Sequence, residues 1–420
     1  MLDLAAGFVS LTALLAFINR RFIGLPPTIG VMAIALIGSL LLHGLTLLGL
    51  PGLEHRIQIA MQQVDFDRLL LDCLLSFLLF AGAMNLDFAN IRKRAWAIGL
   101  LATAGVAISI LGIGLTTWWL LEQLDLGVSL IWCLVFGAVV APTDPVAVLG
   151  ILKSAGAPRS LETTIVGESL FNDGVAVVAF TLLVGALGNK ALPALDETLW
   201  LLLEEIGGGL LLGALLGGLA YRLMKSIDDY QVEVLLTVAL VLGGYTWSIH
   251  LDVSGPIAMT VAGLIVGNLV RERALSDRTR KHLDSFWTLI DEFLNALLFV
   301  LMGLELVLVP FEWRYVPLAM ALILVILGVR LATVGPPLAL IGFWKRELPP
   351  GAARILTWGG LRGGVSVALV LALPSGDERD LFLNLTYLVV LFSVLVQGLT
   401  IGGLVRHTCR AVPPRQAQRD

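Results

Sequence analysis

Long apolar runs, separated by short polar or Pro/Gly-containing segments, recur along the whole chain. Most runs approach the roughly 20 residues that an α-helix needs to cross about 30 Å of hydrocarbon. The pattern therefore predicts an all-α membrane protein with thirteen transmembrane helices. The predicted spans are residues 4–19, 28–50, 69–86, 96–119, 128–150, 162–186, 201–224, 231–249, 254–270, 286–309, 315–342, 353–373 and 381–404.

Basic residues are unevenly divided between the loops that join these spans. If Met1 lies outside the cell, 21 of the 28 Lys and Arg residues fall in cytoplasmic segments, five fall outside and two lie within spans. Basic loops are retained on the cytoplasmic side of a membrane. We therefore expect a multi-pass protein of the cell membrane with its N-terminus outside and its C-terminus in the cytoplasm.

The composition agrees with a membrane protein and excludes several other classes. Hydrophobic residues make up 57% of the chain and charged residues 14%, against about a quarter charged in soluble domains. A net charge of −4 without a basic, aromatic-rich patch argues against nucleic acid as a partner. The five histidines and three cysteines show none of the spacings of metal or disulfide frameworks, so we expect no cofactor.

Two predicted spans contain helix-breaking residues near mid-membrane. Span 128–150 reads AVVAPTDPVAV, where Pro142 and Pro145 each remove a backbone donor. Span 353–373 reads TWGGLRGGVSV, where four glycines surround an arginine. The two spans lie seven apart in order, so they cross the membrane in opposite directions. Interrupted helices at matching positions mark midplane sites in transporters, so we expect two inverted repeats with crossed discontinuous helices.

Span 162–186 carries the polar residues on which the functional interpretation depends. Ser169 and Asp173 share one helix face, and Glu168 and Asn172 share another. A carboxylate at the centre of a membrane helix costs roughly 2.5–3.5 kcal/mol, so it should face a cavity or a partner. Asp173 is therefore predicted to be the shared cation and proton site.

Oxygen ligands for a small hard cation are expected at the same depth. The carboxylate of Asp173, the hydroxyl of Ser169 and an oxygen of Thr143 form the predicted Na⁺ site. Asn172 cannot titrate and would supply hydrogen bonds only. Two roles stay open for Asp144, which either binds the ion or caps the second half of the broken helix.

The charged residues of other spans need partners in the membrane core. Arg362 is always charged, and Glu168 is its predicted counter-ion in a structural ion pair. Arg330 has no obvious partner in the sequence; it either faces the broken helices or reaches the cytoplasmic surface. Asp291, with Glu292 and Asn295, is placed at the start of span 286–309, where the helix dipole accounts for the acids.

Four separated motifs, in this order, resemble the NhaP-type sodium/proton antiporters, relatives of the animal sodium/hydrogen exchangers. They are TDPVAV, GESLFNDGVAVVAF, TWGGLRGGVSVAL and LFSVLVQGLT. One departure is Ala81, where many members of that family carry a glutamate.

The resemblance implies the NhaA/NapA-like antiporter fold, a homodimer, and a six-helix core that moves like an elevator against a dimerisation domain. It divides the chain into dimerisation helices in 1–86, core helices in 96–186, a connector and further dimerisation helices in 201–309, core helices in 315–404, and a short cytoplasmic tail in 405–420.

The family's site residues match positions of this chain one by one. Its ion-binding aspartate and the preceding asparagine match Asp173 and Asn172. Its serine and threonine ligands match Ser169 and Thr143. The aspartate of its unwound helix matches Asp144, and its structural ion pair matches Glu168 and Arg362.

The predicted function is exchange of Na⁺ or Li⁺ for H⁺ by a secondary transporter, with a single carboxylate binding one ion or the other. A one-to-one, electroneutral exchange follows if only Asp173 titrates. The main alternative is a potassium/proton antiporter of the same fold. A cation channel, or a membrane enzyme using Asp144 and Asp173 as a dyad, accounts for neither helix break. We therefore expect no enzymatic activity.

Overall fold

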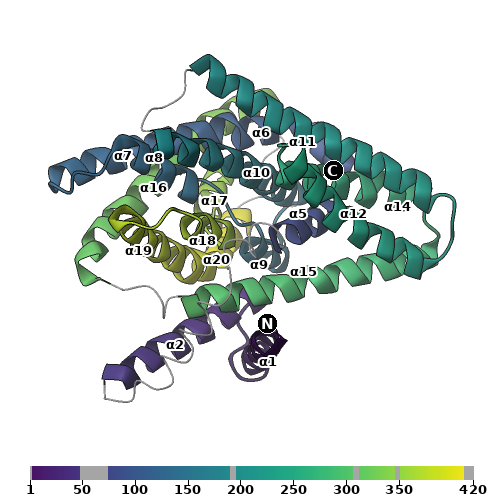
Figure 1. Cartoon of the computed structure of the whole chain (residues 1–420). Coiled ribbons are helices and arrows are strands. Elements are labelled where there is room, and N and C mark those ends of the chain that lie inside the picture. The colour runs from purple at the N-terminus through teal and green to yellow at the C-terminus, as the bar shows by residue number, and fades with distance from the viewer. Residues whose placement is uncertain (1, 48–73, 190–194, 306–311, 346–350, 411–420) are drawn as a thin grey trace.

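The structure is a computed structural model that describes residues 2–47, 74–189, 195–305, 312–345 and 351–410. Every regular element in these ranges is a helix (Figure 1). The prediction of an all-α protein is therefore confirmed for the described part of the chain. The end of span 28–50, the start of span 69–86 and part of the predicted tail lie outside the described residues.

Eight described helical stretches are long and apolar enough to cross a membrane. Three shorter apolar helices accompany them. The number of thirteen crossings stays a prediction. The eight stretches are Ala6–Ile23, Phe88–Gln123, Arg159–Gly188, Asp196–Met224, Tyr230–His250, Asp277–Leu304, Trp313–Leu338 and Asp377–Thr408.

One hydrophobic cluster joins five elements on one side of the molecule, drawn at the right of Figure 1. It is built from buried side chains such as Phe80, Met259 and Trp287. Its elements are α5 (Leu75–Met84), α11 (Leu195–Met224), α12 (Tyr230–His250), α13 (Gly255–Ile265) with its continuation Val266–Val270, and the first half of α15 (Asp277–Glu305).

A larger cluster surrounds both predicted helix breaks. Its elements are α1 (Leu2–Ile18), α2 (Pro27–Leu47), α6 (Phe88–Ala102), α7 (Ala104–Gln123), α8 (Leu130–Val140), α9 (Val146–Ala155), α10 (Arg159–Asn189), the second half of α15, α16 (Val316–Lys345), α17 (Ala352–Trp358), α18 (Gly364–Leu371), α19 (Asp377–Leu391) and α20 (Gly398–Arg410). The π-helical segment Phe392–Gln397 joins α19 to α20.

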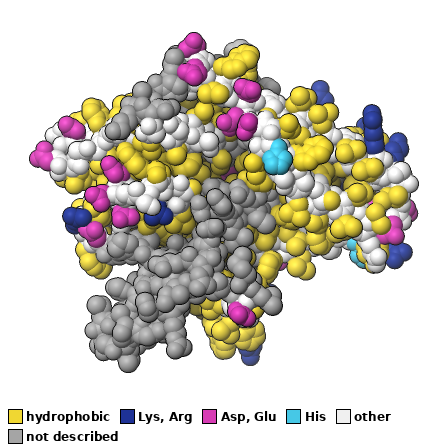
Figure 2. All heavy atoms as spheres, viewed as in Figure 1, with side chains coloured by type: hydrophobic (Ala, Val, Ile, Leu, Met, Phe, Trp, Pro, Cys, Tyr) yellow, Lys and Arg dark blue, Asp and Glu magenta, His cyan; other side chains and the backbone are white. Residues whose placement is uncertain are grey.

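Hydrophobic side chains cover much of the outer surface in Figure 2, and charged side chains gather toward the ends of the molecule. Large apolar side chains stand exposed along α11 and α12, including Leu203, Leu211, Leu215, Leu235 and Trp247. Burying apolar area in lipid is favourable, so exposed leucines are what a membrane-facing helix requires.

Close approach of α11 and α13 depends on glycines without side chains. A Cβ at Gly213 would lie 3.0 Å from the Cα of Ala258 and would overlap its carbonyl oxygen. A Cβ at Gly218, on the same helix, would meet no heavy atom within 4 Å. Small residues allow helix backbones to approach closely in membranes, so Gly213 sets the distance between these two helices.

We expect Gly213→Ala to lower the melting temperature of the purified protein, because overpacking typically costs about 1–3 kcal/mol. Gly218→Ala is the matched control and should leave the melting temperature unchanged or raise it slightly, because alanine favours a helix more than glycine does. Thermal unfolding in detergent measures both. Equal melting temperatures for the two variants would contradict the tight contact.

Candidate functional site

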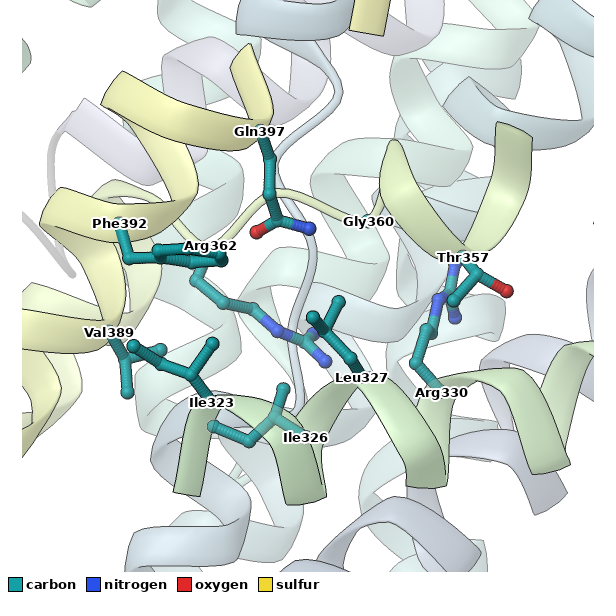
Figure 3. A pocket seen from close by; sticks show the side chains of 10 residues that line it. All are labelled: Ile323, Ile326, Leu327, Arg330, Thr357, Gly360, Arg362, Val389, Phe392 and Gln397. Carbon is teal, nitrogen blue, oxygen red and sulfur yellow. The ribbon is translucent and has the colours of Figure 1, made fainter. Parts of the chain in front are cut away.

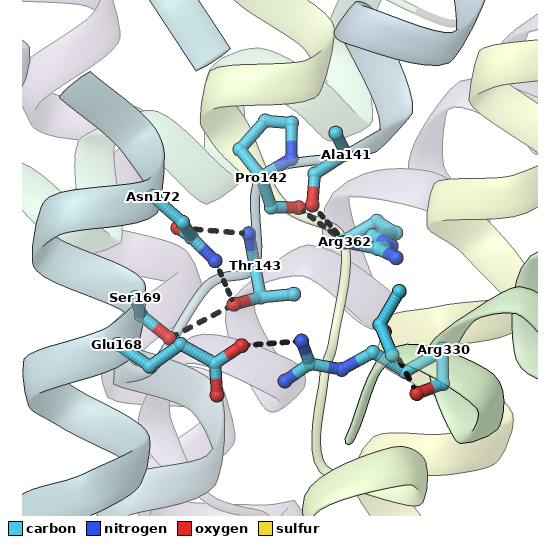
Figure 4. Close-up of polar contacts among 9 residues, drawn as sticks. Ala141, Pro142, Thr143, Glu168, Ser169, Asn172, Arg330 and Arg362 are labelled. Atoms are coloured by element: carbon cyan, nitrogen blue, oxygen red, sulfur yellow. Dashed lines mark hydrogen bonds and ion pairs between the residues drawn. The ribbon is translucent and has the colours of Figure 1, made fainter. Parts of the chain in front are cut away.

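The first helix break lies between α8 and α9, at residues 141–145. Pro142 and Pro145 have no backbone N–H, so a continuous helix would lack donors at both positions. The carbonyls at the end of α8 are thereby left without helical partners. The break predicted from the sequence is present, and it exposes backbone oxygens inside the protein (Figure 4).

The second break lies between α17 and α18, at Gly359–Gly363. The backbone N–H of Asp144 donates to the carbonyl of Leu361 at 2.7 Å, so the two breaks meet directly. A Cβ at Gly363 would overlap the carboxylate of Asp144. Glycine is therefore required at this position, because the two interrupted segments pass too closely for a side chain.

The predicted polar residues of α10 contact the first break. The hydroxyls of Thr143 and Ser169 are 3.0 Å apart, and the side-chain amide of Asn172 donates to the Thr143 hydroxyl at 2.8 Å (Figure 4). All three side chains are buried. The structure thus brings together an unwound segment and one helix face that are separated by more than 25 residues in the sequence.

Asp173 lies one turn beyond Ser169 on the same helix and is 5% exposed. Its Oδ1 atom is buried and has no hydrogen-bond partner among the described residues. It directly follows Asn172, whose amide bonds Thr143, so it lies beside the first break. Buried polar atoms almost always have partners, so an unpartnered carboxylate oxygen is a place for a proton or a cation.

Glu168 has a different partner from the one predicted. Its carboxylate, only 1% exposed, pairs with Arg330 of α16 and not with Arg362 (Figure 4). The physical reason is that Arg330 of α16 reaches in beside Gly360 and meets the Glu168 carboxylate, whereas the guanidinium of Arg362 is directed to the end of α8. The open question about Arg330 is thereby decided, because it faces the broken helices instead of the membrane surface.

Arg362 is held by backbone oxygens. Its guanidinium donates to the carbonyls of Ala141 and Pro142, at the C-terminal end of α8 (Figure 4). The end of a helix carries partial negative charge and unpaired carbonyls, and a cation there compensates both. Arg362 therefore caps the first half-helix, whereas the sequence predicted that it pairs with Glu168.

A small cavity lies between α16, the second break and the segment that joins α19 to α20 (Figure 3). Arg330 and Arg362 both line it, together with Gly360 and Gln397. Apolar side chains such as Ile326 and Phe392 close the remaining sides. The two buried arginines therefore border one shared space behind the crossing.

Two residues of the LFSVLVQGLT motif hold the second break in place and were missed as site residues. Ser393 accepts a hydrogen bond from the backbone N–H of Arg362 at 2.7 Å. Gln397 donates to the carbonyl of Trp358 at 3.0 Å. Their polarity inside an apolar span was the signal that pointed to them.

The structure has no helix end near Asp291, contrary to the helix start that the sequence interpretation assumed there. Helix α15 begins at Asp277, so Asp291 lies near its middle and not at its start. The helix dipole acts only within the first turn and does not account for this acid. Glu292 beside it is exposed, whereas Asn295, one turn further on, is buried.

The sequence is similar to known proteins over nearly its whole length. Residues 9–407 match the family described as sodium/hydrogen exchanger, transmembrane. The chain is 53% identical over 421 residues to the Na⁺/H⁺ antiporter NhaP of Pseudomonas aeruginosa, with 100% of this chain and 99% of that protein covered. It is 34% identical over 382 residues to the Na⁺/H⁺ antiporter NhaH of Halobacillus aidingensis, with 89% and 91% covered.

A solved structure shares the fold. The sodium proton antiporter MjNhaP1 of Methanocaldococcus jannaschii superposes with a TM-score of 0.71 at 19% sequence identity. The match covers 96% of this chain and 97% of that one. The architecture of nearly the whole chain is therefore that of a known antiporter structure.

The partner of Glu168 is testable by a double-mutant cycle. Glu168→Gln or Arg330→Gln alone strands a buried charge, which costs about 3–5 kcal/mol for a fully buried pair. The double variant should lose much less than the sum of the two, because neither charge then lacks its partner. Melting temperatures in detergent report the coupling. The matched cycle of Glu168→Gln with Arg362→Gln should show weaker coupling, and the reverse ranking would restore the predicted pair.

Proposed function

Because the chain belongs to the sodium/hydrogen exchanger family of transmembrane proteins, as its four motifs indicated, we propose that it exchanges Na⁺ for H⁺ across the cell membrane. Two curated relatives that it matches over most of their length are named as Na⁺/H⁺ antiporters. Asp173 binds the two ions in turn. The observation that carries this assignment is its buried, unpartnered carboxylate oxygen beside the meeting point of two broken helices.

The proposed site combines oxygen atoms that are suited to a small cation. The Asp173 carboxylate and the hydroxyls of Ser169 and Thr143 supply the ligands, and hard monovalent cations prefer such oxygens. Asn172 donates to the Thr143 hydroxyl and so directs the lone pairs of that oxygen. The ion is held where backbone is already unwound, as in other transporters with discontinuous helices.

A count of the charges on α10, α16 and the two breaks supports exchange of one cation for one proton. Three carboxylates (Asp144, Glu168 and Asp173) and two guanidinium groups (Arg330 and Arg362) lie in and around the two breaks. The set therefore carries one negative charge when all five groups are ionised. A single Na⁺ or a single H⁺ on Asp173 neutralises it, which keeps the occupied site inexpensive to move through a low-dielectric core.

In this proposal, the helices that carry the two breaks move together, and their movement gives alternating access. Two sets of hydrogen bonds join the breaks: Asp144 N–H donates to the Leu361 carbonyl, and Arg362 donates to the end of α8. The two breaks therefore move as one body. The N-terminus lies outside and the C-terminus in the cytoplasm. A homodimer with the division into core and dimerisation helices given above supplies the fixed part of an elevator.

Replacement of the shared carboxylate is the direct test. Asp173→Asn should insert and fold, because it removes a buried charge, yet it should abolish exchange because amide nitrogen replaces a ligand oxygen that must also titrate. The measurement is the change of internal pH in proteoliposomes after addition of Na⁺, Li⁺ or K⁺ salts. Glu204→Gln, at an exposed acid on α11, is the control and should retain exchange. Wild-type rates in Asp173→Asn would exclude a single-site mechanism.

Electroneutral exchange predicts an equilibrium that does not respond to voltage. We expect the Na⁺ gradient that balances a fixed pH gradient to be the same at zero and at −100 mV, set with potassium and valinomycin. One uncompensated charge couples to about 2.3 kcal/mol per 100 mV, which would shift the balance point about fifty-fold. A shift of that size would show that a second carboxyl, with Asp144 first among the candidates, titrates during the cycle.

A further inference from the structure

Asp291 is an acidic residue in the membrane-spanning part of α15 that the mechanism above does not use. It lies 14 residues beyond the start of the helix at Asp277, and its side chain is half-buried. The buried side chain of Asn295 donates to its carboxylate at 3.0 Å and to its carbonyl at 2.8 Å. A carboxylate held in place at this depth is costly and is by default a functional candidate.

The face of α15 that carries Asp291 is directed toward the helix crossing. Asp291, Asn295 and Leu298 are spaced i, i+4 and i+7, so they share one face. Leu298 packs so closely on the second break that a Cβ at Gly364 would overlap its side chain. The adjacent Gly363 touches Asp144 in the same way. Asp144 and the face of α15 that carries Asp291 therefore meet neighbouring residues of the second break.

Asp291 also lies where α15 passes from one hydrophobic cluster to the other. Trp287, one turn before it, is buried in the cluster of α5, α11, α12 and α13. Leu298, two turns after it, is buried in the cluster around the breaks. In Figure 1, α15 runs along the edge of the group that contains α9, α18 and α20. The polar pair Asp291–Asn295 thus lies at the boundary between two apolar clusters, on the face of α15 that leads to the second break.

We propose that Asp291, oriented by Asn295, is the entry site that attracts the transported monovalent cation and passes it by way of Asp144 to Asp173. This inference rests on the proposed function. A carboxylate attracts cations, which raises their local concentration and the rate of association. Asp291 belongs to α15 and not to α10 or the two breaks, so it acts on the ion only from the side of the membrane on which α15 begins.

The test compares Asp291→Asn with Glu292→Gln, a neighbouring acid that is exposed on the same helix. Asparagine has the same size as aspartate and keeps an acceptor for Asn295, so folding should be preserved. Melting temperatures equal to that of the wild type verify this. Initial rates of Na⁺-driven proton movement are measured in proteoliposomes with the protein oriented in one direction. Na⁺ is offered from each side in turn, at low ionic strength and again with added choline chloride.

For Asp291→Asn we expect KM for Na⁺ to rise about three- to tenfold from the side of the α15 N-terminus, with little change of kcat. The effect should shrink as choline chloride shortens the screening length. KM from the other side, and both values for Glu292→Gln, should stay within about twofold of wild type. Asp291→Glu should recover most of the low KM, because it restores the charge.

Several outcomes would overturn the inference. Equal KM values for Asp291→Asn and Glu292→Gln would show that Asp291 does not attract the cation. A lower kcat with unchanged KM would assign it to the conformational step instead. Both results require that the wild type exchanges Na⁺ for H⁺; absence of exchange in the wild type would refute the proposed function itself and is thus distinguishable.

Discussion

Inside a bilayer no water is available to solvate an opened backbone or an ionised side chain, so each of these groups must find its partner within the protein. Two helices of this chain are interrupted where they meet in space, and each interruption frees backbone groups. The structure satisfies them mutually: Asp144 donates to Leu361, and Arg362 donates to the last carbonyls of α8. The arrangement of the surrounding helices depends on this exchange, because neither break is supportable without the other.

The same constraint explains the remaining buried charges. Glu168 and Arg330 neutralise each other between α10 and α16. Arg362 lies against the negative end of a half-helix, where its charge is favourable. Asp173 has no ion-pair partner among the described residues, and its Oδ1, like Oε2 of Glu168, has no hydrogen-bond partner there. A carboxylate with an unsatisfied oxygen can accept a proton or a small cation, and the proposed competition between Na⁺ and H⁺ requires this.

Hydroxyl and amide groups set the geometry without changing this charge balance. Thr143, Ser169 and Asn172 bind one another across the first break, and all three are uncharged. On the opposite side, Ser393 and Gln397 fix the backbone of the second break. The neutral network thus holds the break segments in position while the charged groups determine what the site accepts.

The sequence alone determined that the chain is helical and membrane-embedded, which spans are broken, and which helix carries the polar face with Asp173. These features depend on local chemistry: apolar length, proline without a donor, glycine without a side chain, and residues four apart on one helix. Only the tertiary structure decided which buried charges pair. Glu168 and Arg362 looked complementary, yet the rotation of α10 directs Glu168 to Arg330, and helix rotation is set by packing against neighbours. In the same way, the start of α15 at Asp277 places Asp291 near the middle of a helix and not at its end, because a polar first stretch of a helix leaves no mark in an apolar pattern.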